Sequence, residues 1–468
     1  MTKQGTILIA IACWLSFHAI RPDAAAADGE RPPFKSLRYD EDYSFLSDPA
    51  QRTDFWDPIK YIPIAGGRAG FLSFGGEARG RFEAYENEFF STQSTADTAY
   101  FLQRYLLHAD YHPTDWLRGF VQLQSSIEGG RDGGPRPTDR DTLDVHQLFA
   151  DLALCPTPDA RLTLRGGRQE MSYGSERLIS AREGLNNRRA FDAARLLYKQ
   201  DSVSVDAFLS SPVEVDTGVF DDQNISGVLF WGSYATVPLP VLPGIKLDLY
   251  YLGLRNPRAV FNQGGGREER HTIGTRFFGT LGHWDMNHEA LYQFGRFGSG
   301  DIQAWSVATD HGYTVTNWWG EPRFGVKAAI ASGDHDASSP DLQTLNPLFP
   351  RGNYFTEASL LGPQNFFDVH PCLQLRPFPK WSFETGLDFY WRENLNDGIY
   401  TPGGSVIYPG NRDLARFVGA DFSSVIVWKA TRNLNVSAAY THFFAGRFIR
   451  QNGGEDVNYG ALWAAYRF

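Results

Sequence analysis

Apolar and polar residues alternate with a period of two between residues 72 and 85. One face of this segment carries Leu72, Phe74, Ala78, Phe82 and Ala84, and the other carries Ser73, Glu77, Arg79, Arg81, Glu83 and Tyr85. Charges of both signs cannot face lipid, so we expect the second face to look into a water-filled interior. This alternation is typical of a strand in a transmembrane β-barrel.

The alternation recurs along the chain and predicts 18 strands in total, a number that is even, as closed antiparallel barrels require. The predicted strands span residues 72–85, 100–111, 116–128, 143–154, 161–170, 191–199, 202–211, 225–236, 244–254, 270–279, 284–294, 300–310, 322–331, 366–376, 381–392, 415–428, 433–445 and 456–468. Their lengths suit tilted strands that cross a bilayer. The predicted fold is all-β, a single-domain transmembrane antiparallel β-barrel.

The predicted connections alternate between short turns and long polar loops. The short turns lie at 112–115, 200–201, 378–380 and 429–432, and the long loops at 87–99, 129–142, 171–190, 255–269, 332–365 and 393–414. Outer-membrane barrels have short periplasmic turns and longer extracellular loops, so every long loop falls outside if the first strand runs outward. A soluble β-propeller would show a repeated blade sequence, and none is visible.

The N-terminal residues read as a secretion signal. Lys3 is followed by an apolar stretch at 7–20 and by small residues at 25–27, which predicts a signal peptide over residues 1–27. A lipoprotein acylated at Cys13 is the alternative, but it would have almost no apolar region before the cysteine. Residues 28–66 are polar and Pro-rich and are predicted to form a periplasmic lead or to enter the lumen in part. Residues 67–468 would then form the barrel.

Composition supports a wall that is apolar on one side only. Aromatic residues make up 15% of the chain, yet its mean hydropathy is −0.35. The net charge of −10 argues against nucleic-acid binding. Most of the 44 basic residues are Arg, whose planar group holds carboxylates at two points, although a GC-rich genome also enriches Arg. Cys155 and Cys372 are far apart, so neither a disulfide framework nor a metal cluster is expected.

Several stretches resemble the alginate export family of outer-membrane porins. They include residues 37–43 (LRYDEDY), 57–63 (DPIKYIP), 72–79 (LSFGGEAR), 165–169 (RGGRQ), 331–334 (ASGD), 346–355 (NPLFPRGNYF), 370–371 (HP) and 388–392 (DFYWR). The resemblance covers nearly the whole chain after the signal peptide. It implies an 18-stranded barrel with an Arg-rich constriction that passes an anionic polysaccharide such as alginate, and it leaves the substrate of this chain open.

Strand alternation by itself assigns ten basic residues to inward faces: Arg79, Arg81, Arg104, Arg118, Arg165, Arg195, Arg276, Arg323, Lys327 and Arg392. Basic groups in a narrow wet pore favour anions over cations. The same faces carry Glu77, Glu83, Asp110, Glu128, Asp206, Asp248, Glu289, Asp368, Glu384, Asp388 and Asp421. The alternative is therefore a set of cross-strand ion pairs that only stiffen the sheet. Inward aromatics available to stack on sugar rings are Phe120, Phe149, Phe208, Trp305 and Tyr390.

Other chemistry is weakly supported. Loop 332–365 contains Asp334, His335, Asp336 and Asp341, which offer oxygen ligands for calcium but match no calcium-loop spacing, so a solvated loop is the simpler interpretation. A hydrolytic barrel would need a nucleophile and base on one rim, and neither His108 nor His146 has a spacing that singles it out. The sequence lacks the nucleophile-elbow and phosphate-binding glycine patterns, so we expect no enzyme activity and no cofactor.

The sequence as a whole predicts a pore in the outer membrane of a Gram-negative bacterium, for passive translocation of an anionic polysaccharide or oligosaccharide. The alternatives are a general or selective uptake porin and, third, an adhesin or structural barrel plugged by its own loops. Expected partners are outer-membrane lipid, the transported solute and periplasmic export proteins, with no nucleic acid.

Overall fold

The computed structural model describes residues 31–64, 70–92, 97–154 and 159–468. The chain divides into two compact units, Met1–Glu41 and Asp42–Phe468. In the described part of the first unit, the 3-10 helix η2 (Arg38–Asp40) is followed by Glu41, whose carboxylate lies 2.7 Å from Nε of Arg38. The predicted signal peptide, Cys13 and Cys155 lie outside the described residues. The predicted domain boundaries stay predictions.

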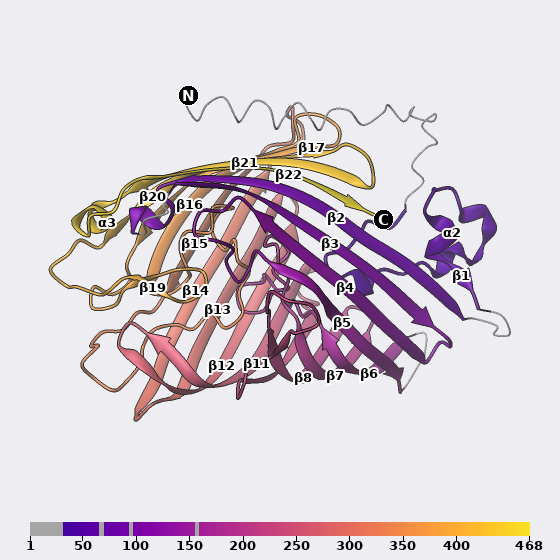
Figure 1. The fold of residues 1–468 in the computed structure, drawn as a ribbon, viewed down its shortest axis with the longest axis horizontal. Coiled ribbons are helices and arrows are strands. Elements are labelled where there is room, and N and C mark those ends of the chain that lie inside the picture. Colours follow the sequence, from indigo (N-terminus) through magenta and orange to yellow (C-terminus); the bar gives the residue numbers. More distant parts are fainter. Residues whose placement is uncertain (1–30, 65–69, 93–96, 155–158) are drawn as a thin grey trace. The chain divides into compact units, whose positions relative to one another are not determined.

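The second unit is built around one antiparallel sheet of 20 strands, two of which, β1 (Ile62–Pro63) and β9 (Gln223–Asn224), have two residues each. The other 18 strands form the barrel wall in Figure 1. They are β2 (Phe71–Glu86), β3 (Thr98–His112), β4 (Leu117–Gly129), β5 (Asp141–Ala153), β6 (Ala160–Gln169), β7 (Phe191–Gln200), β8 (Val203–Glu214), β10 (Leu229–Pro238), β11 (Ile245–Phe261), β12 (Gly264–Leu281), β13 (Trp284–Phe297), β14 (Gly300–Thr314), β15 (Arg323–Ala331), β16 (Phe366–Leu375), β17 (Trp381–Trp391), β20 (Phe417–Lys429), β21 (Leu434–Ala445) and β22 (Val457–Arg467).

The barrel closes where β22 pairs with β2. Glu77 and Arg467 are register partners, and Gly76 and Phe468 exchange two backbone hydrogen bonds of 2.9 and 3.1 Å. Closure pairs the first strand of the wall with the last, so the sheet has no unpaired end strand, as membrane barrels require. The predicted fold class is confirmed. Among the described residues, no helix is long and apolar enough to cross a membrane.

One predicted loop is wrong. Residues 255–269 continue the sheet, because β11 runs to Phe261 and β12 starts at Gly264, with register partners as far as Phe261 and Gly264. A bulge between Asn256 and Ala259 interrupts this hairpin without ending it. The pattern of apolar and polar residues is lost here although the ladder of backbone hydrogen bonds persists, so alternation could not reveal these strand ends.

The outer face of the wall is apolar. Leu107, Leu148, Leu209 and Leu462 expose 53%, 57%, 53% and 53% of their surface, as expected of side chains that face lipid. Trp305 was predicted to point inward but lies on this face, where it is exposed and opposite Tyr292, because the buried positions of β14 are the even ones, such as Ala304 and Ser306.

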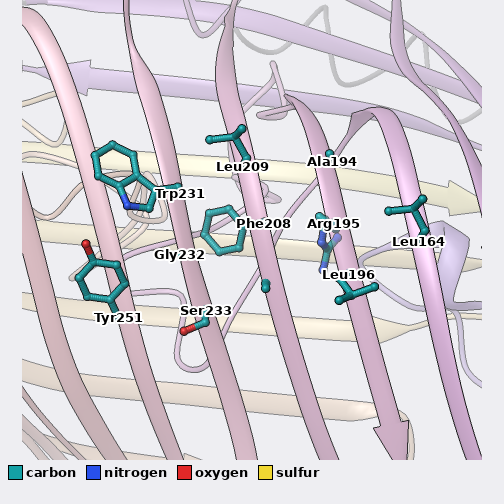
Figure 2. Close-up of a pocket in the computed structure, with 11 residues that line it drawn as sticks. Leu164, Ala194, Arg195, Leu196, Phe208, Leu209, Trp231, Gly232, Ser233 and Tyr251 are labelled. Carbon is teal, nitrogen blue, oxygen red and sulfur yellow. The ribbon is translucent and has the colours of Figure 1, made fainter.

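A hollow of about 490 Å³ lies on the same outer face, between β6 and β11. Figure 2 shows the exposed side chains of Leu164, Leu196 and Leu209 around it, with Trp231 and Gly232 beside them. The hollow therefore belongs to the lipid-facing surface and not to the lumen.

Short elements accompany the barrel at both ends. Before β2 lie η3 (Ser44–Ser47), η4 (Pro49–Gln51) and α2 (Asp57–Lys60). Trp56 stacks on Phe468 with ring centroids 4.4 Å apart and donates a 2.8 Å hydrogen bond to the Tyr466 hydroxyl, so this segment packs against the end of β22. The long loops contain η5 (Glu88–Ser91), the hairpin of β18 (Ile399–Tyr400) and β19 (Val406–Tyr408), and α3 (Arg447–Gln451).

Candidate functional site: the barrel lumen

Two long loops pack against the inner face of the wall. Loop 170–190 joins β6 to β7, and loop 332–365 joins β15 to β16. Met171 and Ile179 of the first loop are fully buried in a cluster with wall residues such as Phe208 and Phe230. The two loops also meet each other, because the Ser180 amide donates a 3.0 Å hydrogen bond to the carbonyl oxygen of Phe349. Together they fill much of the lumen.

Arg79 and Arg104 hold loop 170–190 by its backbone. The Arg79 guanidinium donates to the carbonyl oxygens of Glu183 (3.2 Å), Gly184 (3.1 Å) and Leu185 (2.8 Å). Arg104 reaches two of the same oxygens, at 3.0 and 2.8 Å, and pairs with Glu77 on the neighbouring strand at 2.6 Å. These two wall residues therefore fix where the loop crosses the lumen.

Arg81 connects the wall to the other loop. Its guanidinium lies 3.0 Å from the Glu357 carboxylate of loop 332–365, and it also contacts Glu83 (2.5 Å) and the Tyr459 hydroxyl (2.6 Å) on the wall. Its position over the Trp463 ring, 4.5 Å from the centroid, adds a cation–π contact. Arg81 therefore connects the wall to loop 332–365.

Arg118 and Arg165 form bidentate ion pairs along the wall. Arg118 donates to both oxygens of Asp110 at 2.7 and 2.8 Å, and Arg165 does the same to Asp151. The Arg165 guanidinium also lies 4.1 Å from the ring centroid of Phe149. This stretch fits the predicted alternative of a stiffening ion-pair ladder.

Four more predicted residues face carboxylates on the adjacent strand or on the strand after it. The pairs are Arg195 with Asp206 (2.9 Å), Arg276 with Asp248 (2.7 Å), Arg323 with Asp285 (2.5 Å) and Asp310 (2.8 Å), and Lys327 with Glu384 (2.7 Å). Each cation is partly neutralised where it stands, which weakens its long-range pull on a mobile anion.

Arg392 holds a different loop. Its guanidinium is buried just beyond β17 and donates to the backbone oxygens of Leu395, Asn411, Leu414 and Ala415 at 2.8–3.2 Å. It therefore fastens the connection between β17 and β20. All ten predicted basic residues lie on the inward face of their strand or just beyond it. Their role in selecting the solute stays a prediction.

Alternation along strands missed two arginines, because they lie in loop 170–190. Within the part of the chain that the structure describes, the half-buried Arg182 guanidinium forms no hydrogen bond or ion pair. The Arg189 guanidinium donates to the Pro350 carbonyl oxygen (3.2 Å) and lies over the Phe349 ring. Burial lowers the pKa of Arg182 to about 10, and burial followed by the Arg182 charge lowers the pKa of Arg189. Among the described residues, these two guanidinium groups therefore form a basic site with which no carboxylate pairs.

The same loop also contains a tightly paired carboxylate. Glu170 is 1% exposed and contacts the Arg188 guanidinium and, at 2.8 Å, the His146 ring. Burial raises the pKa of Glu170, but Arg188 and His146 outweigh that effect and hold it at about 2. The ion pair anchors the start of the loop to its end.

Two of the aspartates that the sequence offered as calcium ligands accept hydrogen bonds from loop 332–365 and from β14. Asp336 accepts hydrogen bonds from the Ser338 amide (3.1 Å) and hydroxyl (2.5 Å), and Asp341 accepts one from the Asp301 amide at 2.9 Å. Asp334 is only 2% exposed, so the loop is not simply solvated, and calcium binding there stays a prediction.

A closed 18-stranded barrel with a polar, loop-filled interior defines an outer-membrane pore with a porin fold. The sequence matches the alginate export family over residues 71–462, and the chain belongs to that family. A comparison with curated proteins finds no match.

Solved structures with the same fold are porins. A BenF-like porin from Pseudomonas fluorescens Pf-5 is 10% identical, with a TM-score of 0.57 over 85% of this chain and 98% of that one. OccK9 (OpdG) of Pseudomonas aeruginosa gives the same four values. OccK2 (OpdF) of the same organism, solved in complex with glucuronate, is 11% identical with a TM-score of 0.55, over 85% of this chain and 98% of that one.

Proposed function

We propose that this protein is a passive pore in the outer membrane of a Gram-negative bacterium and carries an anionic polysaccharide or oligosaccharide through a basic lumen. The observation that carries the proposal is the pair Arg182 and Arg189, two guanidinium groups of the lumen loop that pair with no carboxylate of the described residues. A uronate carboxylate would relieve their repulsion and form charge-assisted hydrogen bonds.

Two further observations support the substrate class. Arg351 of loop 332–365, which is also half-buried, donates to the carbonyl oxygens of Asn353 and Tyr354. Among the residues that the structure describes, this segment thus adds a third guanidinium without a carboxylate partner. The similar barrel OccK2 was solved with glucuronate, which is itself a uronate, although at 11% identity that likeness concerns the fold alone.

A second function is favoured by how tightly the loops pack. Cavities beside Arg177 and Glu289, and beside Thr356 and Asp421, each have a volume of only about 10 Å³. A polymer would need the loops to move, whereas a small anion needs a much narrower path. Uptake of small anionic or sugar solutes is therefore the alternative.

The test is the reversal potential of the protein in a planar bilayer under a potassium chloride gradient, with glucuronate and oligouronates of increasing length as blockers. We expect anion selectivity, and block that lasts longer as the oligouronate grows. Selectivity for cations would overturn the proposal. Block by glucuronate that does not strengthen with chain length would favour the uptake alternative.

The double variant Arg182→Ala/Arg189→Ala tests whether uronates block the pore by binding to these two residues. We expect uronate block to weaken at least tenfold, roughly the effect of losing one charge-assisted hydrogen bond. The matched control is Arg267→Ala/Arg296→Ala, which removes the same two charges from side chains that are 59% and 73% exposed near the tips of the β11–β12 and β13–β14 hairpins. Equal loss of block in both variants would show that only the total charge matters.

A further inference from the structure

Three acidic side chains meet where the loop between β8 and β10 covers the start of β5. β5 pairs with β6 only from Leu148 onward, so its first residues offer an open edge on that side. Segment 215–222 fills this edge: Leu143 forms a parallel bridge with Val219, and the Thr142 hydroxyl donates a 2.7 Å hydrogen bond to the Thr217 carbonyl oxygen.

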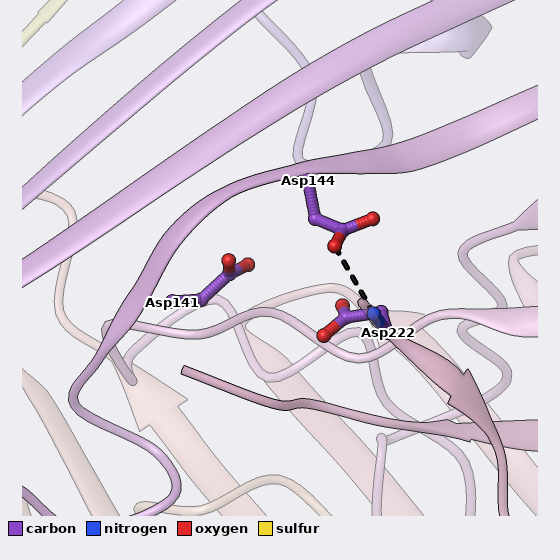
Figure 3. Close-up of side chains that lie close together, drawn as sticks. All are labelled: Asp141, Asp144 and Asp222. Carbon is purple, nitrogen blue, oxygen red and sulfur yellow. Dashed lines mark hydrogen bonds between the residues drawn. The ribbon is translucent and has the colours of Figure 1, made fainter. Parts of the chain in front are cut away.

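Asp141, Asp144 and Asp222 converge at this junction, as Figure 3 shows. One oxygen of each carboxylate lies within 4.8 Å of the others, a spacing that a single cation can bridge. Asp141 is 0% exposed and Asp144 is 3% exposed. Asp144 also accepts backbone hydrogen bonds from Asp221 (2.8 Å) and Asp222 (3.1 Å), so the loop is already fastened to this side chain.

Asp141 lacks the partners that its burial demands. Within the described residues, its Oδ1 atom is buried and accepts no hydrogen bond, and its Oδ2 atom accepts only a long one of 3.3 Å from Gln124. A buried carboxylate oxygen without a donor is costly, because it gives up hydration and gains nothing in exchange. Asp141 belongs to the cluster, where a bound cation would compensate its carboxylate.

The local charge balance also favours a cation. The nearest basic group is Arg168, whose Nη1 lies 3.9 Å from Asp144 while its Nε and Nη2 bind Asp192 at 2.9 and 3.3 Å. One shared guanidinium does not neutralise three carboxylates.

We propose that Asp141, Asp144 and Asp222 bind a calcium ion that fastens segment 215–222 to β5. Calcium accepts six to eight oxygen ligands in irregular geometry, which suits carboxylates contributed by a strand and a loop. Magnesium demands a smaller, regular octahedron and gives up its water reluctantly, so it fits this mixed cluster less well.

The experiment titrates calcium chloride into the detergent-refolded full barrel, after treatment with a chelator, and follows heat by calorimetry and the midpoint of thermal unfolding. We expect one site with a dissociation constant of about 10⁻⁴–10⁻³ M, as in extracellular calcium modules, and a higher unfolding midpoint with calcium. Asp141→Asn and Asp222→Asn should each weaken binding at least tenfold, whereas Asp413→Asn, on another exposed loop, should not.

The variants also separate a cation site from a purely structural role. Without calcium, Asp141→Asn should unfold at the same temperature as the wild type or higher, because it removes repulsion. Should that variant fail to fold, Asp222→Asn, which lies in the loop, gives the same comparison. Absence of saturable calcium binding, equal binding by all variants, or tighter binding of magnesium chloride than of calcium would each overturn the proposal.

Discussion

The Arg79 guanidinium donates a 2.8 Å hydrogen bond to the carbonyl oxygen of Leu185, a residue 106 positions away in the sequence. The acceptor is a backbone atom, so the wall grips this loop whatever side chain the loop carries at that point. Arg104 binds the same oxygen, also at 2.8 Å. Two wall arginines thus set the path of a loop that occupies the lumen.

Replacing Arg79 with alanine should loosen loop 170–190 and raise single-channel conductance. Each hydrogen bond from a charged donor contributes roughly 1.5–3 kcal/mol, so losing several should raise the population of an open loop at least tenfold. Single-channel recording in a planar bilayer measures the change. Arg79→Lys, which keeps the charge without the planar fork, should show an intermediate conductance.

The matched control for that experiment is Arg323→Ala. It removes the same side chain from the inner face, but its ion pairs with Asp285 and Asp310 join strands of the wall. Its conductance should stay near that of the wild type. Equal conductance in Arg79→Ala and the wild type would mean that the Arg79 contacts do not hold the loop in place.

The Glu170 carboxyl should make the protein sensitive to acid. Its pKa is held at about 2, against about 4.3 for an unfolded Glu, so its stabilisation is complete above pH 4.3 and is lost as the pH falls towards 2. A shift of about two units corresponds to about 3 kcal/mol. Guanidinium unfolding of the detergent-solubilised barrel between pH 5 and pH 2 measures this loss.

Glu170→Gln is the control for the acid experiment. It breaks the pair with Arg188 at every pH, so it should be less stable than the wild type at pH 6 by about 3–5 kcal/mol. Below pH 4 its stability should change less than that of the wild type. Parallel pH profiles of the two proteins would assign acid sensitivity to other groups.

A substitution at Gly167 tests the pairing of β5 with β6. Its φ is +128°, and a Cβ at this position would lie 2.2 Å from the Leu148 carbonyl oxygen. Gly167→Ala should cost at least about 1–3 kcal/mol of backbone strain in addition to the clash, and heat resistance of the folded band on an unheated detergent gel reports it. Gly166→Ala, where nothing lies within 4 Å of the added Cβ, should behave like the wild type.

The strands could be predicted from sequence because alternation is a local property of a wall that separates lipid from water. The prediction failed at 255–269, where β11 and β12 continue without that alternation. It also failed for Trp305, since an aromatic ring is common on either face.

The interior was harder to predict. Whether Arg104 faces a solute, Glu77 or the backbone of loop 170–190 depends on contacts between residues far apart in sequence. Alternation assigns a face to strand residues only, so it could not identify Arg182 and Arg189, which lie in loop 170–190. The sequence does show that Arg182 and Arg189 lie close together in a long loop, beside a further basic residue, Arg188.

Pairing between β2 and β22 has a consequence for biogenesis. The Arg467 guanidinium reaches Glu77 across 390 positions at 2.7 Å, so the seam of the barrel joins its earliest strand to its last. No intermediate made of the first strands alone can close, and each would present two unpaired edges to lipid or to other chains. The growing sheet must therefore be shielded until β22 has been added. The factor that protects its edges then limits the amount of closed barrel that forms.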